Sequence, residues 1–281
     1  MKTAVITGAT SGIGFATAKA FASLGWRVIG IGRDERSCER ARQELQALIP
    51  GAQTEYFAAD LIHQSEVVKA ADKVSAYLCE ACDGKLEVLV NNAGGVRSVY
   101  TTTAEGYEQQ FALNLLAGVL FTHKLLDCLK AANGRVLFTG SNSHKHMRPC
   151  FDDIMLERRY HCLTAYKHTK LLGMLFAQAF NRRFEKEGIR AYVVDPGLVN
   201  TKIGMKQTGG LVRFVWELRR RGGCTPDLPA QTYVQLASAA PAPEGFYYYR
   251  CLERPYSRFV KDEQAAARVF SLCERYCGIR F

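Results

Sequence analysis

The 281-residue chain contains no long hydrophobic run. Its apolar stretches are broken within about ten residues by Gly, Lys, Arg or Asn, whereas a transmembrane helix needs about 20 apolar residues. The pattern of a signal peptide is also missing, because Met1-Lys2 runs directly into an apolar strand and a glycine-rich turn. We therefore expect a cytoplasmic protein without a transmembrane segment.

Metal-binding and nucleic-acid-binding patterns are missing too. The chain has ten cysteines, but neither the C-x-x-C at Cys79 nor the pair Cys273 and Cys277 has further ligands at zinc-site spacing. We expect reduced, ordinary thiols and no metal. The net charge is +10, yet the basic residues are spread along the chain apart from Arg219–Arg221. Without a nucleic-acid motif, this charge indicates an anionic ligand or an anionic membrane surface.

What the sequence does have is a regular alternation of short apolar strands and helical segments. Strands are expected over residues 3–7, 27–31, 54–58, 86–90, 135–139, 190–194 and 246–249, and helices over 14–24, 35–48, 67–78, 111–129, 164–184 and 263–276. This alternation predicts an α/β fold with a doubly wound, mostly parallel sheet of about seven strands. No linker divides the chain, so residues 1–281 are predicted to form a single domain.

The segment Thr7–Gly14 (TGATSGIG) lies between the first strand and the first helix. Gly8 allows a tight turn, Gly12 lets the backbone approach a pyrophosphate, and Gly14 allows the helix to pack closely on the strand. The helix N-terminus then offers N–H groups and a partial positive charge to phosphates. A dinucleotide site is predicted here, the alternative being a plain glycine-rich turn.

The end of the second strand indicates which dinucleotide is bound. An acidic residue at this position would hold the ribose 2′-hydroxyl of NAD, but the strand ends in Ile31-Gly32-Arg33. The guanidinium of Arg33 suits a 2′-phosphate, which favours NADP(H). The alternative is a solvated arginine in a turn. Asp34 is interpreted as the N-cap of the next helix.

Tyr166 and Lys170 are four residues apart on a predicted helix, so their side chains share one face. An ammonium beside a phenol stabilises the phenolate and lowers the tyrosine pKa. The pair is therefore a candidate general acid and base. Taken alone it is weak evidence, because such pairs occur by chance on many helices.

These motifs together resemble those of the short-chain dehydrogenase/reductase family, over nearly the whole chain. They are, in order, T-G-x-x-x-G-x-G at Thr7–Gly14, Asp60-Leu61, N-N-A-G at Asn91–Gly94, Asn114, Ser141, Y-x-x-x-K at Tyr166–Lys170, and Pro196-Gly197 with Thr201. The resemblance implies a Rossmann-type fold and hydride transfer between a nicotinamide and an alcohol or carbonyl carbon.

The resemblance also implies a role for each matched residue. Ser141 would hydrogen-bond the substrate oxygen, and Tyr166 would exchange its proton. Lys170 would lower the tyrosine pKa and hold the nicotinamide ribose, while Asn114 would anchor a water molecule in a proton relay. The residues implied to contact the cofactor, besides Tyr166 and Lys170, are Gly8, Thr10, Ser11, Gly12, Ile13, Gly14, Arg33, Asp60, Leu61, Asn92, Ala93, Gly94, Pro196, Val199 and Thr201.

Two neighbourhoods leave alternatives. Ser143 competes with Ser141, although the position directly after the strand favours Ser141. Tyr160 lies near Tyr166 but lacks a lysine four residues later. The nearby histidines have no convincing metal partners and are interpreted as loop and pocket-rim residues; they are His144, His146, His161 and His168.

The spacing from Ser141 to Tyr166, the segment Gly245–Tyr249 and Arg33 resemble the retinol-dehydrogenase-like branch of the family. That branch implies an apolar substrate such as a steroid, retinoid or lipid aldehyde. The segment from about 201 to 225 is expected to be a substrate lid, with Arg219–Arg221 favouring an acidic group. A membrane-surface helix or an ordinary packed helix is the alternative.

Two other functions compete with carbonyl reduction. One is reduction of a C=C bond on the same fold, and the other is a non-catalytic NADP(H)-binding regulatory module. The presence of Asn114, Ser141, Tyr166 and Lys170 together disfavours the second. The family often pairs through its long helices, so a homodimer or homotetramer is a further expectation.

Overall fold

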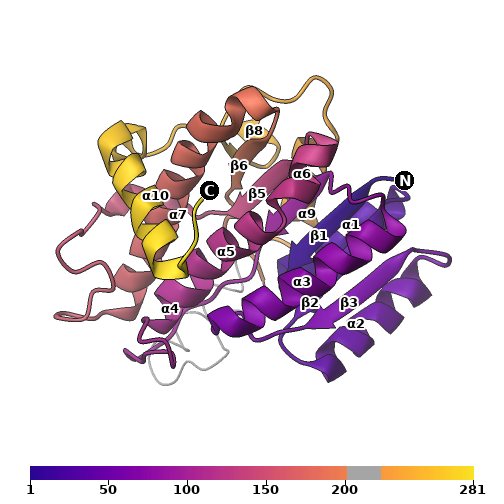
Figure 1. Cartoon of the computed structure of the whole chain (residues 1–281), viewed down its shortest axis with the longest axis horizontal. Coiled ribbons are helices and arrows are strands. Elements are labelled where there is room, and N and C mark those ends of the chain that lie inside the picture. Colours follow the sequence, from indigo (N-terminus) through magenta and orange to yellow (C-terminus); the bar gives the residue numbers. More distant parts are fainter. Residues whose placement is uncertain (201–222) are drawn as a thin grey trace.

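A single sheet of eight strands runs through the computed structural model, which describes residues 1–200 and 223–281 (Figure 1). The strand order is β3-β2-β1-β4-β5-β6-β7-β8, and all neighbours are parallel except β7 and β8. The strands are β1 Thr3–Thr7, β2 Arg27–Gly32, β3 Thr54–Ala58, β4 Val88–Asn91, β5 Arg135–Thr139, β6 Arg190–Val194, β7 Tyr247–Tyr249 and β8 Leu252–Glu253.

The α/β class and the seven parallel strands are confirmed, and the eighth strand is the addition. β8 pairs antiparallel with β7 through a tight turn in which Arg250 and Cys251 have φ of 50° and 63°. Such a turn normally uses Asn and Gly, so this hairpin could not be predicted from its turn residues. The topological switch point lies between β1 and β4, where ligands bind in doubly wound folds.

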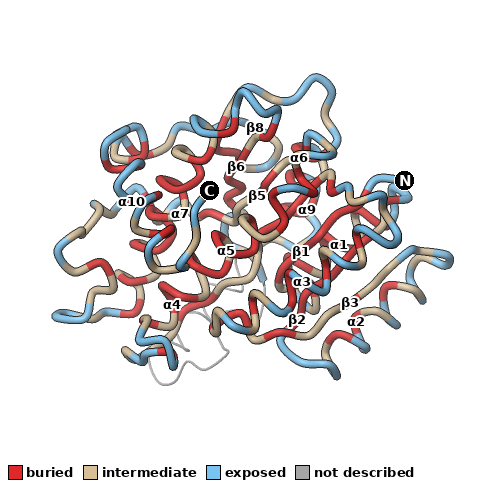
Figure 2. Tube along the Cα trace, in the orientation of Figure 1, coloured by how far each residue is buried: buried red, intermediate tan, exposed pale blue. Residues whose placement is uncertain are grey.

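Two helical layers cover the sheet (Figure 2). The principal helices are α1 Gly12–Ser23, α2 Glu35–Leu48, α3 Gln64–Ala81, α4 Gln109–Phe111, α5 Ala117–Lys124, α6 Leu126–Ala132, α7 Cys162–Phe184, α9 Asp227–Ser238 and α10 Glu263–Cys277. Val5 of β1 belongs to the core beneath α3, α5, α7 and α10, whereas Ala4 and Ile6 belong to the core beneath α1, α2 and α9. This period of two explains why the strands are apolar throughout.

The continuous helix predicted over 111–129 is wrong. The segment is divided into α4, a π-helical turn at Ala112–Leu116, α5 and α6, and Leu125 separates the last two. A π-turn inserts one extra residue into the helical ladder, and such turns are frequent at functional sites. Here the turn contains Asn114.

No single helix of the described residues is long and apolar enough to cross a membrane. Gln109–Lys124 and Leu126–Ala132 pass a length and hydropathy test only as a pair, with a bend of 61° between them. The apolar side chains of this pair, such as Phe111 and Leu120, are buried in the core beneath α3 and α7.

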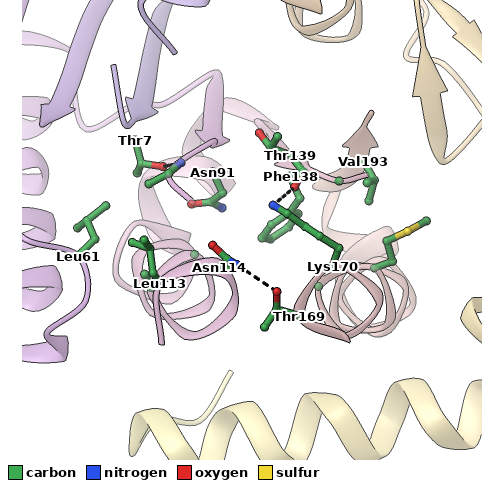
Figure 3. Close-up of a pocket in the computed structure, with 16 residues that line it drawn as sticks. Thr7, Leu61, Asn91, Leu113, Asn114, Phe138, Thr139, Thr169, Lys170 and Val193 are labelled. Carbon is green, nitrogen blue, oxygen red and sulfur yellow. Dashed lines mark hydrogen bonds between the residues drawn. The ribbon is translucent and has the colours of Figure 1, made fainter. Parts of the chain in front are cut away.

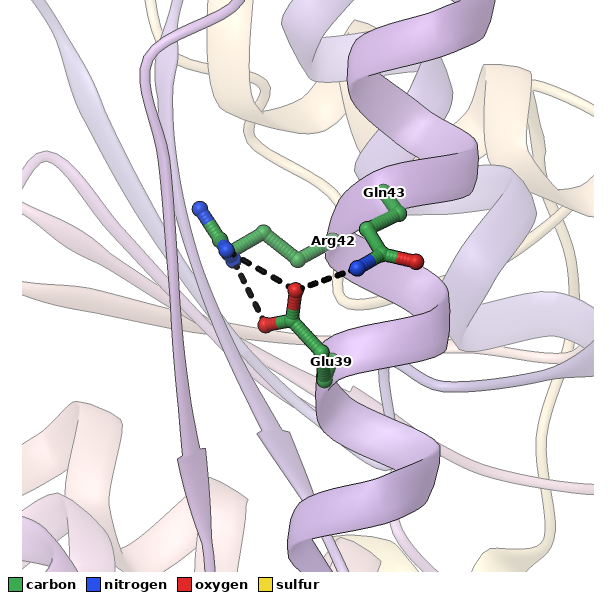
Figure 4. A network of polar contacts seen from close by, with 3 residues as sticks. All are labelled: Glu39, Arg42 and Gln43. Atoms are coloured by element: carbon green, nitrogen blue, oxygen red, sulfur yellow. Dashed lines mark hydrogen bonds and ion pairs between the residues drawn. The ribbon is translucent and has the colours of Figure 1, made fainter.

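The N-cap predicted for α2 is confirmed, because the N–H of Ser37 donates to Asp34 Oδ1 over 2.8 Å. The exposed side of the same helix carries a local polar network (Figure 4). The Glu39 carboxylate accepts hydrogen bonds from Arg42, at 2.9 and 3.0 Å, and from Gln43, at 2.6 Å. Contacts of this i,i+3 and i,i+4 type support a solvated helix face and add little to stability.

The C-terminal helix α10 packs on α7 and closes the outer layer (Figure 1). Phe270 of α10 stacks on Phe176 of α7, with ring centroids 5.1 Å apart. The terminal Phe281 packs into the same aromatic cluster, against Phe180 and Phe184. The long helix that carries Tyr166 is therefore enclosed by its own chain.

Candidate active site

The glycine loop has the close backbone packing expected of a phosphate cradle. Gly8 and Gly12 have φ of 69° and 57°, values that suit glycine. A Cβ on Gly14 would lie 2.2 Å from the Gly8 carbonyl oxygen, so no larger residue fits while this loop keeps its shape. The loop leads directly into the N-terminus of α1. Its geometry fits a dinucleotide pyrophosphate.

Arg33 lies beside this loop at the end of β2. Thr7 pairs with Ile31 in the sheet, and the N–H of Ala9 donates to the Ile31 carbonyl over 3.0 Å. Arg33 is exposed. A Cβ on Gly32 would lie 2.3 Å from Thr10 Cγ2, so the strand end and the loop are in close contact. A cation therefore stands next to the phosphate cradle.

The other predicted cofactor residues follow the neighbouring strands at the same edge. Asp60 and Leu61 come after β3, where the Ala59 N–H bonds to the Gly32 carbonyl over 2.7 Å. Asn92 and Ala93 come after β4, and both of their N–H groups donate to Thr7 Oγ1 over 3.0 Å. The fold brings Asp60, Leu61, Asn92, Ala93 and Gly94 to the cradle side of the switch point.

The Tyr166 hydroxyl meets the side chain of Ser141 at the start of α7. Burial raises the pKa of Tyr166 to about 12, while the hydrogen bond with Ser141 acts in the opposite direction. Ser143 supports this serine, because its hydroxyl donates to Ser141 Oγ over 2.9 Å. Ser141 is thus the serine that faces the tyrosine, as its position after β5 predicted.

Lys170 is buried one turn further along α7, with 7% of its surface exposed. Its Nζ donates to the Thr139 carbonyl over 2.7 Å (Figure 3). The same Nζ lies 5.6 Å from the centroid of the Tyr166 ring. Burial lowers the pKa of Lys170 to about 8, and the charge of Asp195 opposes this shift.

The pKa of Tyr166 is raised in this structure, against the lowering that the proximity of Lys170 predicted. Desolvation of the phenol dominates, and the lysine directs its ammonium to the end of β5. Tyr166 is therefore a protonated phenol at neutral pH, and Lys170 is mostly an ammonium.

Asn114 ties the π-turn to the loop after β4 and to α7. Its Oδ1 accepts from the Gly95 N–H over 2.8 Å, and its Nδ2 donates to the Gly95 carbonyl and to Thr169 Oγ1 over 3.0 and 3.1 Å. The side chain is thus committed to holding these segments together. The predicted anchoring of a water molecule by this residue stays a prediction.

A cavity of about 20 Å³ lies between β4, β5, α5 and α7, next to Asn114 and Lys170 (Figure 3). This is space for about one water molecule. Asn91 also lines the cavity, and its buried Oδ1 has no hydrogen-bond partner among the described residues. The lining of the cavity is mainly apolar, with Asn91, Asn114 and Lys170 among its polar members.

The interpretation of the histidines as loop and pocket-rim residues is wrong for two of the four. His144 is completely buried; its Nδ1 lies 2.7 Å from the Ser141 carbonyl oxygen, and its Nε2 accepts from the Ser257 N–H over 3.2 Å. His168 is buried on α7 and accepts from the Cys150 N–H over 3.0 Å. Burial lowers both pKa values, that of His168 to about 4. Both imidazoles are therefore neutral and act as structural hydrogen-bond partners. His146 and His161 are exposed.

Tyr160, the other tyrosine near the site, belongs to a separate buried network. Its hydroxyl contacts Glu108 Oε1 over 3.1 Å and Gln110 Nε2 over 2.6 Å. Glu108 and Gln110 are each 1% exposed. This network holds the loop before α7 against α4.

Three predicted cofactor residues, Pro196, Val199 and Thr201, and the predicted lid follow β6. Pro196 and Val199 are half-buried at the edge of the sheet, and Val199 forms an isolated parallel bridge with Cys224. Thr201, Arg219–Arg221 and most of the predicted lid lie outside the described residues, which resume at Gly223.

Sequence reasoning missed two contributors to this site. Thr139 supplies the carbonyl that holds Lys170, and a main-chain acceptor has no residue signature. The second contributor is Asp195, the residue after β6, whose carboxylate is buried. The acidic residue at the end of an apolar strand was the available signal, since such a group is rarely buried without a role.

A family model described as short chain dehydrogenase matches residues 2–210, and the chain belongs to this family. The chain is retinol-dehydrogenase-like within it. It is 31% identical to retinol dehydrogenase 12 of Mus musculus over 283 residues, which cover 100% of this chain and 87% of the relative. It is 33% identical to retinol dehydrogenase 14 of Homo sapiens over 301 residues, which cover 99% and 87%.

Solved structures give the same result for the fold. An uncharacterized protein from Mycobacterium Paratuberculosis superposes with a TM-score of 0.78 at 29% identity, covering 100% of this chain and 95% of that chain. An alcohol dehydrogenase from the archaeon Thermococcus sibiricus, complexed with 5-hydroxy-NADP, superposes with a TM-score of 0.68 at 25% identity, covering 91% and 99%. The single Rossmann-type domain is thus confirmed.

Proposed function

We propose that this short-chain dehydrogenase reduces an aldehyde or ketone on an apolar substrate with NADPH, using Tyr166 as the general acid. The observation that carries the proposal is the contact between the Tyr166 and Ser141 side chains beside the buried Lys170. These groups stand at the same sheet edge as the glycine loop, so a hydride donor and a proton donor could meet at one carbonyl group.

The protonation states support reduction. The bound cofactor would supply the hydride from its nicotinamide ring. Ser141 would hold the carbonyl oxygen, and Tyr166, a phenol at neutral pH, would donate its proton to that oxygen. The ammonium of Lys170 would hydrogen-bond the nicotinamide ribose and stabilise the phenolate that remains after proton transfer.

NADP(H) is proposed over NAD(H) because Arg33 stands beside the glycine loop where an acidic residue would select NAD. The Thermococcus sibiricus neighbour, complexed with 5-hydroxy-NADP, supports this choice. Retinol dehydrogenases among the relatives support an apolar substrate such as a retinoid, steroid or lipid aldehyde.

The test is a spectrophotometric screen of NADPH oxidation against aliphatic aldehydes, retinaldehyde, ketosteroids and quinones, run in parallel with NADH. We expect turnover of at least one apolar carbonyl class with NADPH and weaker turnover with NADH. Equal or faster turnover with NADH contradicts the cofactor assignment. A product reduced only at C=C favours the alternative reaction, and unchanged substrate throughout supports the non-catalytic binding module.

We also propose that the chain acts as a monomer, against the expectation of a dimer or tetramer. The apolar face of α7 that carries Phe176 and Phe180 is completely buried, because Phe270 of α10 and the terminal Phe281 pack on it. Light scattering at several concentrations should give a mass near 31.3 kDa. A stable mass of twice that value contradicts this proposal.

A further inference from the structure

Asp195 is a buried acidic residue that the proposed reaction does not use. It follows β6, is 7% exposed, and starts the turn through Pro196 and Gly197. Its Oδ1 accepts from the Gly197 N–H over 2.8 Å, and its Oδ2 accepts from the Tyr247 hydroxyl over 2.6 Å. Both oxygens are thus acceptors, which is the arrangement of a carboxylate.

The sheet register places this carboxylate next to the catalytic group. Thr139 pairs with Val194, and the Gly140 N–H donates to the Val194 carbonyl over 2.7 Å. Asp195 therefore lies one strand away from Gly140 and Ser141. Lys170 bonds to the Thr139 carbonyl at the same point of the sheet. Adjacent strands are about 4.8 Å apart, so the ammonium and the carboxylate share one buried region.

From this placement we infer that Asp195 is a positioning residue whose negative charge keeps the buried Lys170 in its cationic form. The inference rests on the proposed function of Lys170 and extends it. A buried ammonium without a counter-charge loses its proton readily, because low polarity disfavours the charged form. The Asp195 carboxylate supplies that counter-charge through the turn that also shapes the cofactor edge.

The surrounding titratable groups agree with this role. The groups of the described chain on which the charge of Asp195 acts are Lys170 and Tyr166 of α7, His144 beside Ser141, Tyr233 of α9 and Tyr247 of β7. His144 is neutral, and the three tyrosines have raised pKa values. Asp195 is therefore the one described anion that opposes the loss of the Lys170 proton.

The sign of the effect follows directly. A negative charge favours the ammonium form of Lys170 and disfavours the phenolate form of Tyr166, so it raises both pKa values. Removing the charge should lower both. Reduction needs Lys170 and Tyr166 protonated, so activity should be lost at a lower pH than in the wild type.

The test compares Asp195→Asn, which removes the charge, with Tyr247→Phe, which removes one hydrogen bond and keeps the charge. The amide of Asn can still accept from Gly197 and donate to the Tyr247 oxygen. The titration of Lys170 is followed by NMR on ¹³C-labelled lysine, with its signal assigned through Lys170→Arg. The pH profile of kcat/KM for NADPH-dependent reduction is measured in parallel.

We expect Asp195→Asn to move the Lys170 titration and the alkaline limb of kcat/KM to lower pH by about one unit. Tyr247→Phe should leave the Lys170 titration near that of the wild type. An unchanged titration in Asp195→Asn overturns the inference, as does an equal shift in Tyr247→Phe, which would show a purely structural turn. If Asp195→Asn does not fold, Asp195→Ser replaces it with the same expected shift.

The NMR readout needs no substrate, so it separates this inference from the proposed function. A shifted Lys170 titration with no carbonyl turnover in the wild type supports the role of Asp195 and contradicts the reductase proposal. Carbonyl turnover by the wild type together with an unchanged Lys170 titration in Asp195→Asn supports the reductase proposal and contradicts the role of Asp195.

Discussion

The two halves of the sheet edge are held together by different means. On the cofactor half, Gly8 of the glycine loop packs against Gly14 in the first turn of α1, and Arg33 follows the next strand. On the catalytic half, the contacts join distant segments: Ser257 bonds to His144 across 113 residues of sequence, and Tyr247 bonds to Asp195 across 52.

The two halves are therefore sensitive to different substitutions. Local backbone packing makes the cofactor half depend on residue size, while buried long-range hydrogen bonds make the catalytic half depend on charge and protonation. Changes in the first half should therefore alter cofactor binding, and changes in the second should alter rates and pH dependence.

The largest effect is expected on the catalytic half, for Tyr166→Phe. Losing the proton donor should lower kcat/KM by a factor of about 10² to 10⁴. The Kd for NADPH, measured by fluorescence, should stay within about twofold, because the cradle is untouched and the net contribution of the single hydrogen bond between Tyr166 and Ser141 is small. Retention of wild-type turnover by Tyr166→Phe would remove the tyrosine from the mechanism.

The next effect is a dependence of stability on pH that originates at His168. Its pKa is about 4 in the folded chain and about 6.5 when unfolded. Above pH 6.5 neither state binds the proton; as the pH falls from 6.5 toward 4, the unfolded state gains it first and the native state is destabilised. The free energy of unfolding should fall by about 2 kcal/mol between pH 7.5 and 5 from this residue alone.

Urea unfolding at the two pH values checks this. His168→Gln, whose side-chain oxygen can still accept from Cys150, should lose clearly less stability on acidification than the wild type. The exposed His161→Gln serves as the matched control and should behave as the wild type. If the free energy of unfolding falls equally on acidification in the wild type and both variants, His168 is not buried in its neutral form.

A pair of glycine substitutions tests whether residue size limits the cofactor half. Gly14→Ala places a Cβ against the Gly8 carbonyl oxygen and should cost about 2 kcal/mol of stability and weaken NADPH binding. Gly173→Ala, in α7 with no atom within 4 Å of the new Cβ, should change stability by less than about 1 kcal/mol, in the stabilising direction. Equal melting temperatures for the two variants would contradict the packing argument.

The smallest effect is expected for Arg33→Ala. Loss of one charge-assisted contact to a 2′-phosphate should raise the KM for NADPH about tenfold and leave that for NADH nearly unchanged. Arg40→Ala, on the exposed side of α2, is the control and should alter neither. A parallel rise for both cofactors would mean that Arg33 does not read the phosphate.

Much of the cofactor half was predictable because its signals are local. The glycine spacing, the N-cap at Asp34 and the strand-helix alternation each depend on residues within one or two elements, and the structure confirms those elements. The four candidate catalytic residues were predicted from the order of the family's motifs. The structure brings three of them together, namely Ser141, Tyr166 and Lys170.

On the catalytic half, the features that depend on distant residues could not be predicted from the sequence. His144 is buried by contact with Ser257, which lies 113 residues later in the chain, so no local sequence pattern predicts its burial. The π-turn at Asn114 interrupts a helical periodicity that the sequence presents as continuous. The pKa of Tyr166 depends mainly on desolvation inside the folded chain, which raises it. The spacing of Tyr166 and Lys170 predicts only the opposite effect of the ammonium.

The decisive measurement is the transfer of deuterium from [4,4-²H₂]NADPH, labelled on both faces of C4, to the product. We expect mass spectrometry to find the label on the carbinol carbon of the alcohol formed from an apolar aldehyde or ketone, with the hydroxyl proton taken from solvent. Label on a former alkene carbon, or an unlabelled product, would contradict carbonyl reduction at Tyr166.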